Sequence, residues 1–406
     1  MKDYDYVIIG AGIMGLTIAR ELSMRFPDRK ICVLEKEADV AFHSSGRNSG
    51  VLHAGFYYTA DSLKAKFTRE GNEALTLYCE EHHLKINKCG KVVVATNEDE
   101  LKGLYELKKR ANRNGVELQW VNEAQLNAID PNVRTYQRAL YSPSTSTVDP
   151  VEVCHKIRDE VSKNGVDFLF NCPYKSVKDS VVYAGDEAIR FGYLVNAAGL
   201  YADHIAHEAG FGLNYTIIPF KGMYLKYKKN KTDVLTNIYP VPNLNNPFLG
   251  VHFTKTVDGS IKIGPTAIPA FWRENYKGFQ NFKLRECARI LGYQSKLLLT
   301  NAFGFRTLAF EEMRKYLKSY FINLSLGMVK NIDKEGFGDF LRPGIRAQLL
   351  NKQTLELVQD FVIEGDNKSM HVLNAVSPAF TCSFPFARHV VDTICDKQGG
   401  QKIEAS

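Results

Sequence analysis

The sequence lacks any long apolar run, and no stretch approaches the roughly eighteen apolar residues of a membrane-spanning helix. It also lacks the basic segment and the cleavage site of a secretory leader. Its first residues, "MKDYDYVIIGAG", include acidic residues where a leader would be basic. We therefore expect a cytoplasmic location and no transmembrane segment. Peripheral attachment to the inner membrane stays open.

Cysteine is sparse and scattered, with eight residues, no Cys-x-x-Cys pair and no cluster of Cys with His. In a chain without a leader, such cysteines are expected to be reduced thiols, mostly buried as small apolar residues. Because zinc sites need ligands at characteristic spacings, we expect no metal site.

We recognise no concentrated basic stripe in the sequence. Its 52 lysines and arginines against 45 acidic residues give a net charge of +7. Nucleic-acid-binding proteins usually carry such a stripe, so we expect no nucleic-acid partner. A mild positive excess instead suits an anionic cofactor and a small anionic substrate.

The first clear pattern is a strand, a helix and a second strand over residues 4–36. "YDYVIIG" and "KICVLEK" are short apolar runs typical of buried strands, and the helix between them has apolar residues at helical spacing. Strands and helices alternate up to about residue 215 and again after 342, whereas strands dominate between 214 and 340. With 406 residues, the chain suits two interleaved domains, one parallel α/β and one largely antiparallel.

A glycine motif joins the first strand to the first helix. Gly10, Gly12 and Gly15 fit G-x-G-x-x-G, in which the glycines permit a tight turn, close backbone approach to a pyrophosphate, and helix–strand packing. The helix N-terminus offers free N–H groups to phosphates. Glu35 ends the second strand, where it can accept hydrogen bonds from ribose hydroxyls. The motif predicts a dinucleotide site; the alternative is a plain strand–helix–strand unit whose glycines only turn the chain.

Two further segments favour FAD over a nicotinamide cofactor. After Glu35 the chain does not continue into the next strand–helix pair of a nicotinamide dehydrogenase but enters "SGRNSGVLHAGFYYT", residues 45–59. In "YLVNAAGLYADHIA", residues 193–206, a strand runs into Gly199 and a helix, so a second turn can approach the same dinucleotide.

These segments carry a family resemblance. The chain resembles FAD-dependent oxidoreductases of the D-amino-acid-oxidase-like superfamily, and more closely the L-2-hydroxyglutarate oxidase/dehydrogenase family, over nearly its whole length. The narrower likeness lies in "SGRNSGVLHAGFYYTADSLKAKF", "IIPFKGMY", "RPGIRAQL" and "MHVLNAVSPAFTCSFPFARHVVD". It implies a Rossmann-like FAD-binding domain interleaved with an antiparallel-sheet substrate domain, and FAD bound non-covalently rather than covalently.

The expected domain boundaries follow from this likeness and the change in texture. The discontinuous FAD-binding domain is expected to comprise residues 1–84, 143–215 and 341–396. The substrate domain is expected at 85–142 and 216–340, with a tail at 397–406.

The resemblance also implies which residues contact FAD. They belong to the glycine motif, the end of the second strand, the segment after it, three later turns and the start of the last helix. The expected FAD-contacting residues are Gly10, Gly12, Ile13, Met14, Gly15, Glu35, Lys36, Ser44, Ser45, Gly46, Asn48, Ser49, Gly50, Val51, Tyr174, Ala198, Gly199, Gly344, Ile345, Ala379, Phe380 and Thr381.

His53 is the expected catalytic base, because the resemblance puts it beside the flavin on the substrate side. A neutral imidazole, with a reference pKa of about 6.5, can take a hydroxyl proton near neutral pH. The alternative is a histidine that only forms hydrogen bonds within its loop.

Arg47 departs from the family pattern, in which histidine stands in "GHNSG". Arg47 faces either the FAD phosphates or a substrate carboxylate, and its presence puts the exact substrate in doubt. Each other candidate has an ordinary alternative, such as a surface ion pair or a sheet residue without a role in binding. The expected substrate-binding residues are Arg47, Tyr58, Lys221, His252, Arg342 and Arg346.

The expected reaction is FAD-dependent oxidation of a 2-hydroxy acid to the 2-oxo acid, with L-2-hydroxyglutarate as the leading substrate. Hydride would pass to flavin N5 while the histidine takes the proton. An amine or amino-acid oxidase like glycine or sarcosine oxidase, a glycerol-3-phosphate dehydrogenase, and a non-redox or RNA-modifying flavoprotein are the alternatives. Oxygen and a membrane quinone both stay open as electron acceptors.

Overall fold

The computed structural model describes residues 1–242 and 250–399, and its chain divides into two compact units. The first unit comprises Met1–Arg47, Pro150–Ile218 and the chain from Ala347 onward; the second comprises Asn48–Asp149 and Pro219–Arg346. Residues 48–84 and 143–149, which the sequence expectation assigned to the FAD-binding domain, group with the second unit. They do so because β8 (Ser146–Val148) pairs with β3 (Val51–Leu52) and also with β4 (Ile86–Asn87), a strand of the expected substrate domain.

The first unit is built on a sheet in the order β10-β11-β12-β1-β2-β9, with β22 also paired to β12 and β21 to β22. Its strands are β1 (Lys2–Ile9), β2 (Ile31–Leu34), β9 (Asp167–Leu169), β10 (Tyr174–Lys178), β11 (Val181–Ala184), β12 (Glu187–Asn196), β21 (Val362–Gly365) and β22 (Ser369–Asn374). Its helices are α1 (Ile13–Arg25), α5 (Pro150–Lys163), α6 (Ala202–Glu208) and α10 (Ala379–Lys397).

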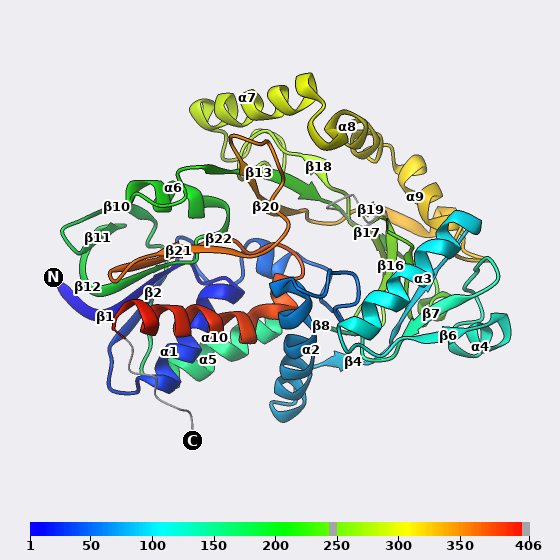
Figure 1. The fold of residues 1–406 in the computed structure, drawn as a ribbon, viewed down its shortest axis with the longest axis horizontal. Coiled ribbons are helices and arrows are strands. Elements are labelled where there is room, and N and C mark those ends of the chain that lie inside the picture. The colour runs from blue at the N-terminus through cyan, green and yellow to red at the C-terminus, as the bar shows by residue number, and fades with distance from the viewer. Residues whose placement is uncertain (243–249, 400–406) are drawn as a thin grey trace. The chain divides into compact units, whose positions relative to one another are not determined.

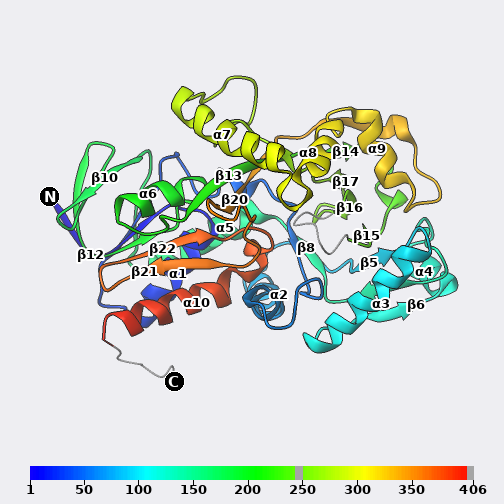
Figure 2. The same ribbon diagram turned by 45° about the horizontal axis from the view of Figure 1, so that its top comes forward.

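Parallel pairing in this sheet joins β12 to β1, β1 to β2, β2 to β9, and β12 to β22. The helices α1, α5 and α10 pack side by side, as both ribbon views show (Figures 1 and 2). Val7, Ile9, Cys32 and Leu34 of β1 and β2 are buried in a hydrophobic core with residues of β11, β12 and α6. The predicted α/β fold of Rossmann type is therefore confirmed.

The second unit contains a large sheet in the order β19-β14-β17-β16-β15-β5-β7-β6 and a small sheet β3-β8-β4. Its strands are β3 (Val51–Leu52), β4 (Ile86–Asn87), β5 (Lys91–Val94), β6 (Gln119–Val121), β7 (Ala139–Ser142), β8 (Ser146–Val148), β14 (Leu225–Tyr227), β15 (Asn237–Pro240), β16 (His252–Lys255), β17 (Ile261–Gly264), β18 (Ile268–Pro269) and β19 (Phe337–Phe340). Two strands, β13 (Tyr215–Gly222) and β20 (Gly344–Asn351), carry the chain between the units.

The helices of the second unit are α2 (Leu63–Glu81), α3 (Glu98–Arg113), α4 (Glu123–Ile129), α7 (Leu284–Thr300), α8 (Phe305–Arg314) and α9 (Lys318–Leu326). The large sheet is antiparallel except for the β15–β5 pair, as the sequence predicted for this region. The apolar run "FLGVHFT", residues 248–254, lies partly outside the described residues, and its described end forms the start of β16. Helices also occur in the part of the chain where the sequence pattern showed mostly strands, and α8 and α9 follow one another there.

The two faces of the large sheet differ in chemistry. Val92, Ile238, Phe253 and Ile263 point into an apolar core. Because side chains alternate along a strand, their neighbours Lys91, Tyr239, His252 and Lys262 lie on the opposite face. This alternation places basic side chains of three strands, Lys91 of β5, His252 of β16 and Lys262 of β17, on one face of the sheet.

Two expectations about composition can also be compared with the structure. All eight cysteines are free thiols, and five of them are buried, as predicted. Within the described residues, no helix is long and apolar enough to cross a membrane.

Candidate functional site

In the first unit, the turn from β1 into α1 requires glycine at two positions. Gly10 has a φ of +105°, and a Cβ added there would stand 2.7 Å from the Ala197 carbonyl oxygen. A Cβ on Gly15 would stand only 1.9 Å from the Gly10 carbonyl oxygen, which is far inside van der Waals contact. The turn is thus built for backbone approach, as the motif predicted.

The N-terminus of α1 is suited to an anion. Gly12 is the N-cap residue and has no side chain to cap the helix, and the first turn of α1, which is wholly described, contains no acidic residue. The Ile13 N–H donates to Ser45 Oγ at 2.9 Å, which brings the serine-rich segment to this helix end. Partial positive charge at a helix N-terminus favours a phosphate.

Glu35 lies at the end of β2, next to the glycine turn. Its carboxylate accepts the Ala11 N–H at 2.8 Å and the Glu37 N–H at 3.0 Å. Burial raises the pKa of Glu35, and these two backbone donors act in the opposite direction. A carboxylate has about four acceptor positions, so two donors leave capacity for ribose hydroxyls.

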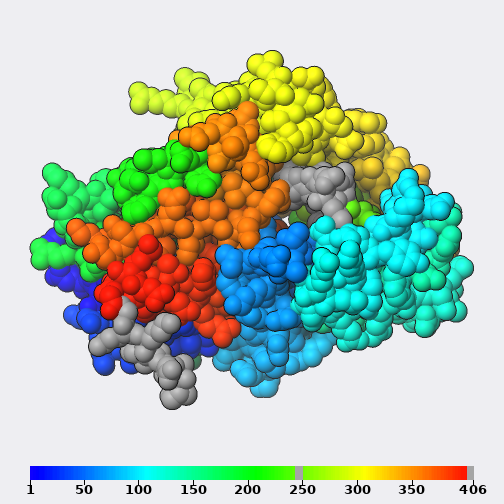
Figure 3. All heavy atoms as spheres, in the orientation of Figure 1, coloured from blue at the N-terminus to red at the C-terminus, as the bar shows by residue number. Residues whose placement is uncertain are grey.

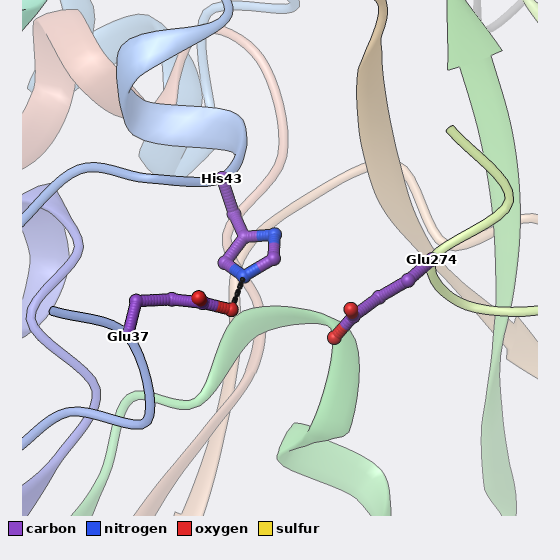
Figure 4. Close-up of side chains that lie close together, drawn as sticks. All are labelled: Glu37, His43 and Glu274. Carbon is purple, nitrogen blue, oxygen red and sulfur yellow. Dashed lines mark hydrogen bonds and ion pairs between the residues drawn. The ribbon is translucent and has the colours of Figure 1, made fainter. Parts of the chain in front are cut away.

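Polar and charged side chains in the segment that follows Glu35 contact one another. His43 Nε2 lies 2.9 Å from Glu37 Oε1, and the ring is directed at that carboxylate (Figure 4). Lys36 Nζ pairs with Glu37 at 3.0 Å and lies 5.4 Å from the centroid of the Tyr201 ring. Neither His43 nor Glu37 was singled out in the sequence, because neither belongs to a recognisable motif.

The turn Ser44–Gly46 is a short 3-10 helix near the end of the first segment of the first unit, Met1–Arg47. A Cβ on Gly46 would stand 2.2 Å from the Ala41 carbonyl oxygen, so this glycine too is required by close packing. Arg47 donates from Nε to the Phe42 carbonyl oxygen at 2.8 Å and lies 5.1 Å from the Phe42 ring centroid. These contacts hold Arg47 within its own loop.

The second predicted turn follows β12. Gly199 has a φ of +55°, and the Ala198 N–H donates to Asn196 Oδ1 at 3.2 Å. Since β12 is parallel to β1, its carboxyl end meets the glycine turn at the same edge of the sheet. The Tyr174 hydroxyl, at the start of β10, donates a hydrogen bond to Glu208 Oε2 at 2.6 Å.

The last helix begins at three of the predicted residues. Ala379, Phe380 and Thr381 form the first turn of α10, which has no acidic side chain. Ala379 and Thr381 are buried. The turn leaves the positive end of a long helix free of neutralising carboxylates of its own.

In the second unit, the segment from Asn48 is fixed by local hydrogen bonds. The Gly50 N–H donates to Asn48 Oδ1 at 2.8 Å, and the Gly50 carbonyl accepts from Val148 at 2.8 Å. Further along, Asn114 Nδ2 donates to the carbonyl oxygens of Gly55 and Tyr58, each at 3.0 Å. The segment from Asn48 to Tyr58 is thus held by hydrogen bonds to Val148 and Asn114.

This anchoring places His53 inside the unit. The side chain is buried. Burial lowers its pKa well below the ordinary value of 6.5, and electrostatic interactions with Lys91 and His252 lower it further. The imidazole is therefore neutral at physiological pH and can accept a proton.

Lys91 is a basic residue that the sequence did not reveal. It is fully buried on β5, and burial lowers its pKa to about 7. Its Nζ lies 4.5 Å from the ring centroid of Tyr239, 5.1 Å from that of Tyr57 and 5.2 Å from that of Phe56. Three aromatic faces at this range stabilise a cation, which partly offsets its desolvation. In the sequence it only opens the apolar run "KVVVAT", so strand pairing alone could identify it.

His252 lies on the same sheet face. Its ring stacks on Tyr239 with the centroids 3.7 Å apart and the planes at 16°. Nδ1 donates to the Gly250 carbonyl oxygen at 2.8 Å, and burial lowers the pKa of His252 to about 3. The other ring nitrogen is then an unprotonated acceptor.

Three further basic groups of this unit are buried or half-buried. Burial lowers the pKa of Lys262 to about 8 and that of Arg346 to about 10, and it lowers the pKa of Lys221. Lys262 Nζ lies 4.9 Å from the Tyr224 ring centroid, and the Tyr58 hydroxyl acts electrostatically on Arg346. Arg342, in contrast, is exposed at the end of β19. The basic cluster is defined here as His53, Lys91, His252 and Lys262.

Comparison with known proteins gives a consistent result. The model of the FAD dependent oxidoreductase family (DAO) matches residues 5–393. A mitochondrial L-2-hydroxyglutarate dehydrogenase of Nematostella vectensis is 37% identical, over 98% of this chain and 91% of the relative. The L-2-hydroxyglutarate dehydrogenase of Escherichia coli K12 is 33% identical, over 96% and 93%.

Solved structures show the same fold. An FAD-bound L-alpha-glycerophosphate oxidase from Mycoplasma pneumoniae superposes with a TM-score of 0.76 at 21% identity, covering 97% of this chain and 95% of that one. Glycine oxidase from Geobacillus kaustophilus gives 0.69 at 15% identity, covering 98% and 96%. With its glycine turn, its parallel sheet and a family match along almost its full length, the chain belongs to the DAO family of FAD-dependent oxidoreductases.

Proposed function

We propose that this protein catalyses the FAD-dependent oxidation of L-2-hydroxyglutarate to 2-oxoglutarate. The names of relatives that are 33–37% identical over nearly the whole chain support this substrate. The observation in the structure that supports it best is the basic cluster around the neutral, buried His53. A buried proton acceptor among cationic groups suits an anionic substrate with a hydroxyl to be oxidised.

The residues of the first unit fit a bound FAD. Gly10, Gly12 and the N-terminus of α1 would receive the pyrophosphate, and Glu35 would receive a ribose. We propose non-covalent binding through these groups. When bound, the flavin supplies a hydride acceptor at N5.

His53 is proposed to take the proton of the substrate hydroxyl. As the α-carbon loses hydride and the carbonyl double bond forms, the hydroxyl proton moves to the imidazole. The lowered pKa of His53 keeps the ring unprotonated and ready for this transfer at neutral pH. His252, with Nδ1 engaged by Gly250, would present its free ring nitrogen as an acceptor toward substrate.

The substrate carboxylates are proposed to bind the buried cations. Burial disfavours the charged forms of Lys221, Lys262 and Arg346, and a carboxylate brought beside them would stabilise those forms. A dicarboxylate supplies two such charges. Arg47, Tyr58 and Arg342 stay as predicted contacts, with Arg47 the residue most suited to altering specificity.

We also propose an electron acceptor and a cellular location for this protein. Oxygen and a membrane quinone were both open from the sequence. We favour a quinone at the inner membrane, with the enzyme on the cytoplasmic side, because of the exposed surface described in the next subsection. We propose no nucleic-acid partner.

Anaerobic flavin reduction tests the proposed reaction. The purified protein, reconstituted with FAD, would be mixed with L- or D-2-hydroxyglutarate, L-lactate, glycerol 3-phosphate, glycine or sarcosine while flavin absorbance is followed. Rapid bleaching by L-2-hydroxyglutarate is expected. Bleaching only by glycine or sarcosine would replace the proposal with amine oxidation, and bleaching only by glycerol 3-phosphate with another alcohol donor.

A further inference from the structure

The chain's excess of positive charge is concentrated in one segment, contrary to the even spread inferred from the sequence. Residues 277–330 contain ten lysines and arginines against three glutamates, an excess of seven. The whole chain contains 52 against 45, also an excess of seven, so the remainder is balanced. Nine of the ten basic residues in the segment are exposed.

The same segment exposes large apolar side chains. Phe279, Leu299 and Phe303 are 82%, 81% and 74% exposed. Eleven of the 23 exposed large hydrophobic residues in the described chain fall within these residues. They are Phe279, Phe282, Leu284, Leu291, Leu299, Phe303, Phe310, Met313, Tyr316, Leu317 and Leu324. Single exposed apolar residues are ordinary, but such a concentration marks an interaction surface.

Helix α7 arranges these residues in stripes. Ile290, Gln294 and Leu297 are buried and fix its inner face. At 100° per residue, Leu284, Leu291 and Leu299 lie within about 80° of one another on the exposed side. Arg285, Arg289 and Lys296 fall in the adjoining sector. An apolar stripe bordered by cations is the pattern of a helix that lies in a membrane interface.

Helix α8 repeats the arrangement. Phe305, Ala309 and Glu312 are buried, whereas Phe310, Met313, Arg306 and Arg314 are exposed. The four exposed residues share a sector of about 100° around the helix. Figures 1 and 2 show α7, α8 and α9 following one another along the second unit, and Figure 3 shows this yellow segment on the molecular surface.

Two of the three glutamates in the segment are engaged away from this surface. Glu312 accepts one hydrogen bond from Lys315 Nζ and another from the Ala267 N–H at 2.5 Å. Glu286 accepts the Arg273 N–H at 2.5 Å. Glu311 is left as the exposed acid among the segment's exposed cations.

We propose that residues 277–324, called here the docking face, bind the surface of an anionic phospholipid bilayer. Lysine and arginine would contact the lipid phosphates, while leucine and phenylalanine enter the boundary of the acyl chains. A symmetric contact with a second copy would place like charges against each other. Nucleic acid would match the cations but would leave the leucines without an apolar partner.

Vesicle flotation tests the docking face with the FAD-loaded protein. Vesicles of phosphatidylcholine alone would be compared with vesicles that also contain phosphatidylglycerol. Binding to the anionic vesicles is expected, weakened by salt, with little binding to the neutral ones. Equal binding to both, or binding to neither, would overturn the proposal.

Two triple variants separate the contributions. Arg285→Glu with Arg289→Glu and Lys296→Glu is expected to weaken binding by at least about 100-fold, since each basic residue near a charged bilayer contributes about fivefold. Leu299→Ser with Phe303→Ser and Phe310→Ser is expected to weaken it at least about tenfold. The matched controls are Lys102→Glu with Lys109→Glu and Arg113→Glu on α3, and Leu77→Ser with Leu213→Ser, all at exposed positions. Controls that lose binding equally would contradict the assignment.

Light scattering and RNA binding address the other occupants. If the apolar triple variant changes a dimer into a monomer and the parent binds no vesicles, the docking face is a subunit interface. If the parent binds poly(U) RNA and not vesicles, it is a nucleic-acid surface. Either result overturns the proposal. All variants should keep the parent rate of flavin reduction by L-2-hydroxyglutarate in solution. This measurement distinguishes a failure of the proposed function from a failure of the docking face.

Discussion

The ammonium of Lys91 lies 4.5 Å from the ring centroid of Tyr239. Lys91 also acts electrostatically on His53 and lowers the pKa of that imidazole. Lys91 is fully buried, and His53 is almost fully buried. A charge held at this depth acts through a medium of low dielectric constant, where its influence on a neighbouring imidazole is large. We therefore expect Lys91 to set the protonation of His53 without contacting substrate.

Replacement of Lys91 by methionine should shift the pH profile of flavin reduction. Loss of the positive charge raises the pKa of His53, because Lys91 now lowers it. The base is active when unprotonated, so the acid limb of the profile should move to higher pH. Lys91→Arg should retain the low position of the limb if it folds. An unchanged acid limb in Lys91→Met, with Lys109→Met as the exposed control, would contradict this role.

Lys91 should also make stability depend on pH. Its pKa is about 7 in the folded protein against an ordinary 10.5, so between these values the unfolded chain binds more protons. The free energy of unfolding should therefore rise with pH across this window, by at most about 1.4 kcal/mol per pH unit from this group. Thermal unfolding from pH 7 to 10 should show this rise in the parent and a flatter curve in Lys91→Met. If the parent and Lys91→Met gave parallel curves, Lys91 would be charged in the folded protein and the predicted pH dependence would be wrong.

Replacement of His53 by alanine should slow flavin reduction by L-2-hydroxyglutarate about 10²–10⁴-fold, the usual contribution of a general base. Substrate binding should change less, because the carboxylates are proposed to bind other groups. Stopped-flow absorbance at saturating substrate separates the two effects. The control is His83→Ala, an exposed position. A rate close to that of the parent would leave His53 with only the hydrogen-bonding role.

The glycine turn predicts a contrast between two alanine substitutions. In Gly15→Ala the new Cβ would stand 1.9 Å from a backbone oxygen, so α1 must move and the free energy of unfolding should fall by at least about 1–3 kcal/mol. FAD affinity should fall with it. Gly292→Ala, in the exposed part of α7 with nothing within 4 Å of the added atom, should instead stabilise by up to about 1 kcal/mol. Denaturant unfolding and FAD titration measure both, and a neutral Gly15→Ala would disprove the packing argument.

The sequence by itself determined the part of the protein whose chemistry is local. Gly10, Gly12, Gly15 and Glu35 could be read in order because a strand, a turn, a helix and a strand that follow directly can adopt only a few arrangements. The structure adds the reason for the glycines, since two of the added Cβ atoms would collide with backbone oxygens.

The second unit shows the opposite case, in which only tertiary structure decided the outcome. Lys91 and His252 are separated by 161 positions, and they meet because β5 and β16 both pair with β15 in one sheet. Pairing register and the alternation of side chains decide which face each residue occupies, and neither follows from a single strand's sequence. Burial then decides protonation, because the same lysine at the surface would keep its ordinary pKa. The sequence thus identified the cofactor family, while sheet pairing created the basic cluster.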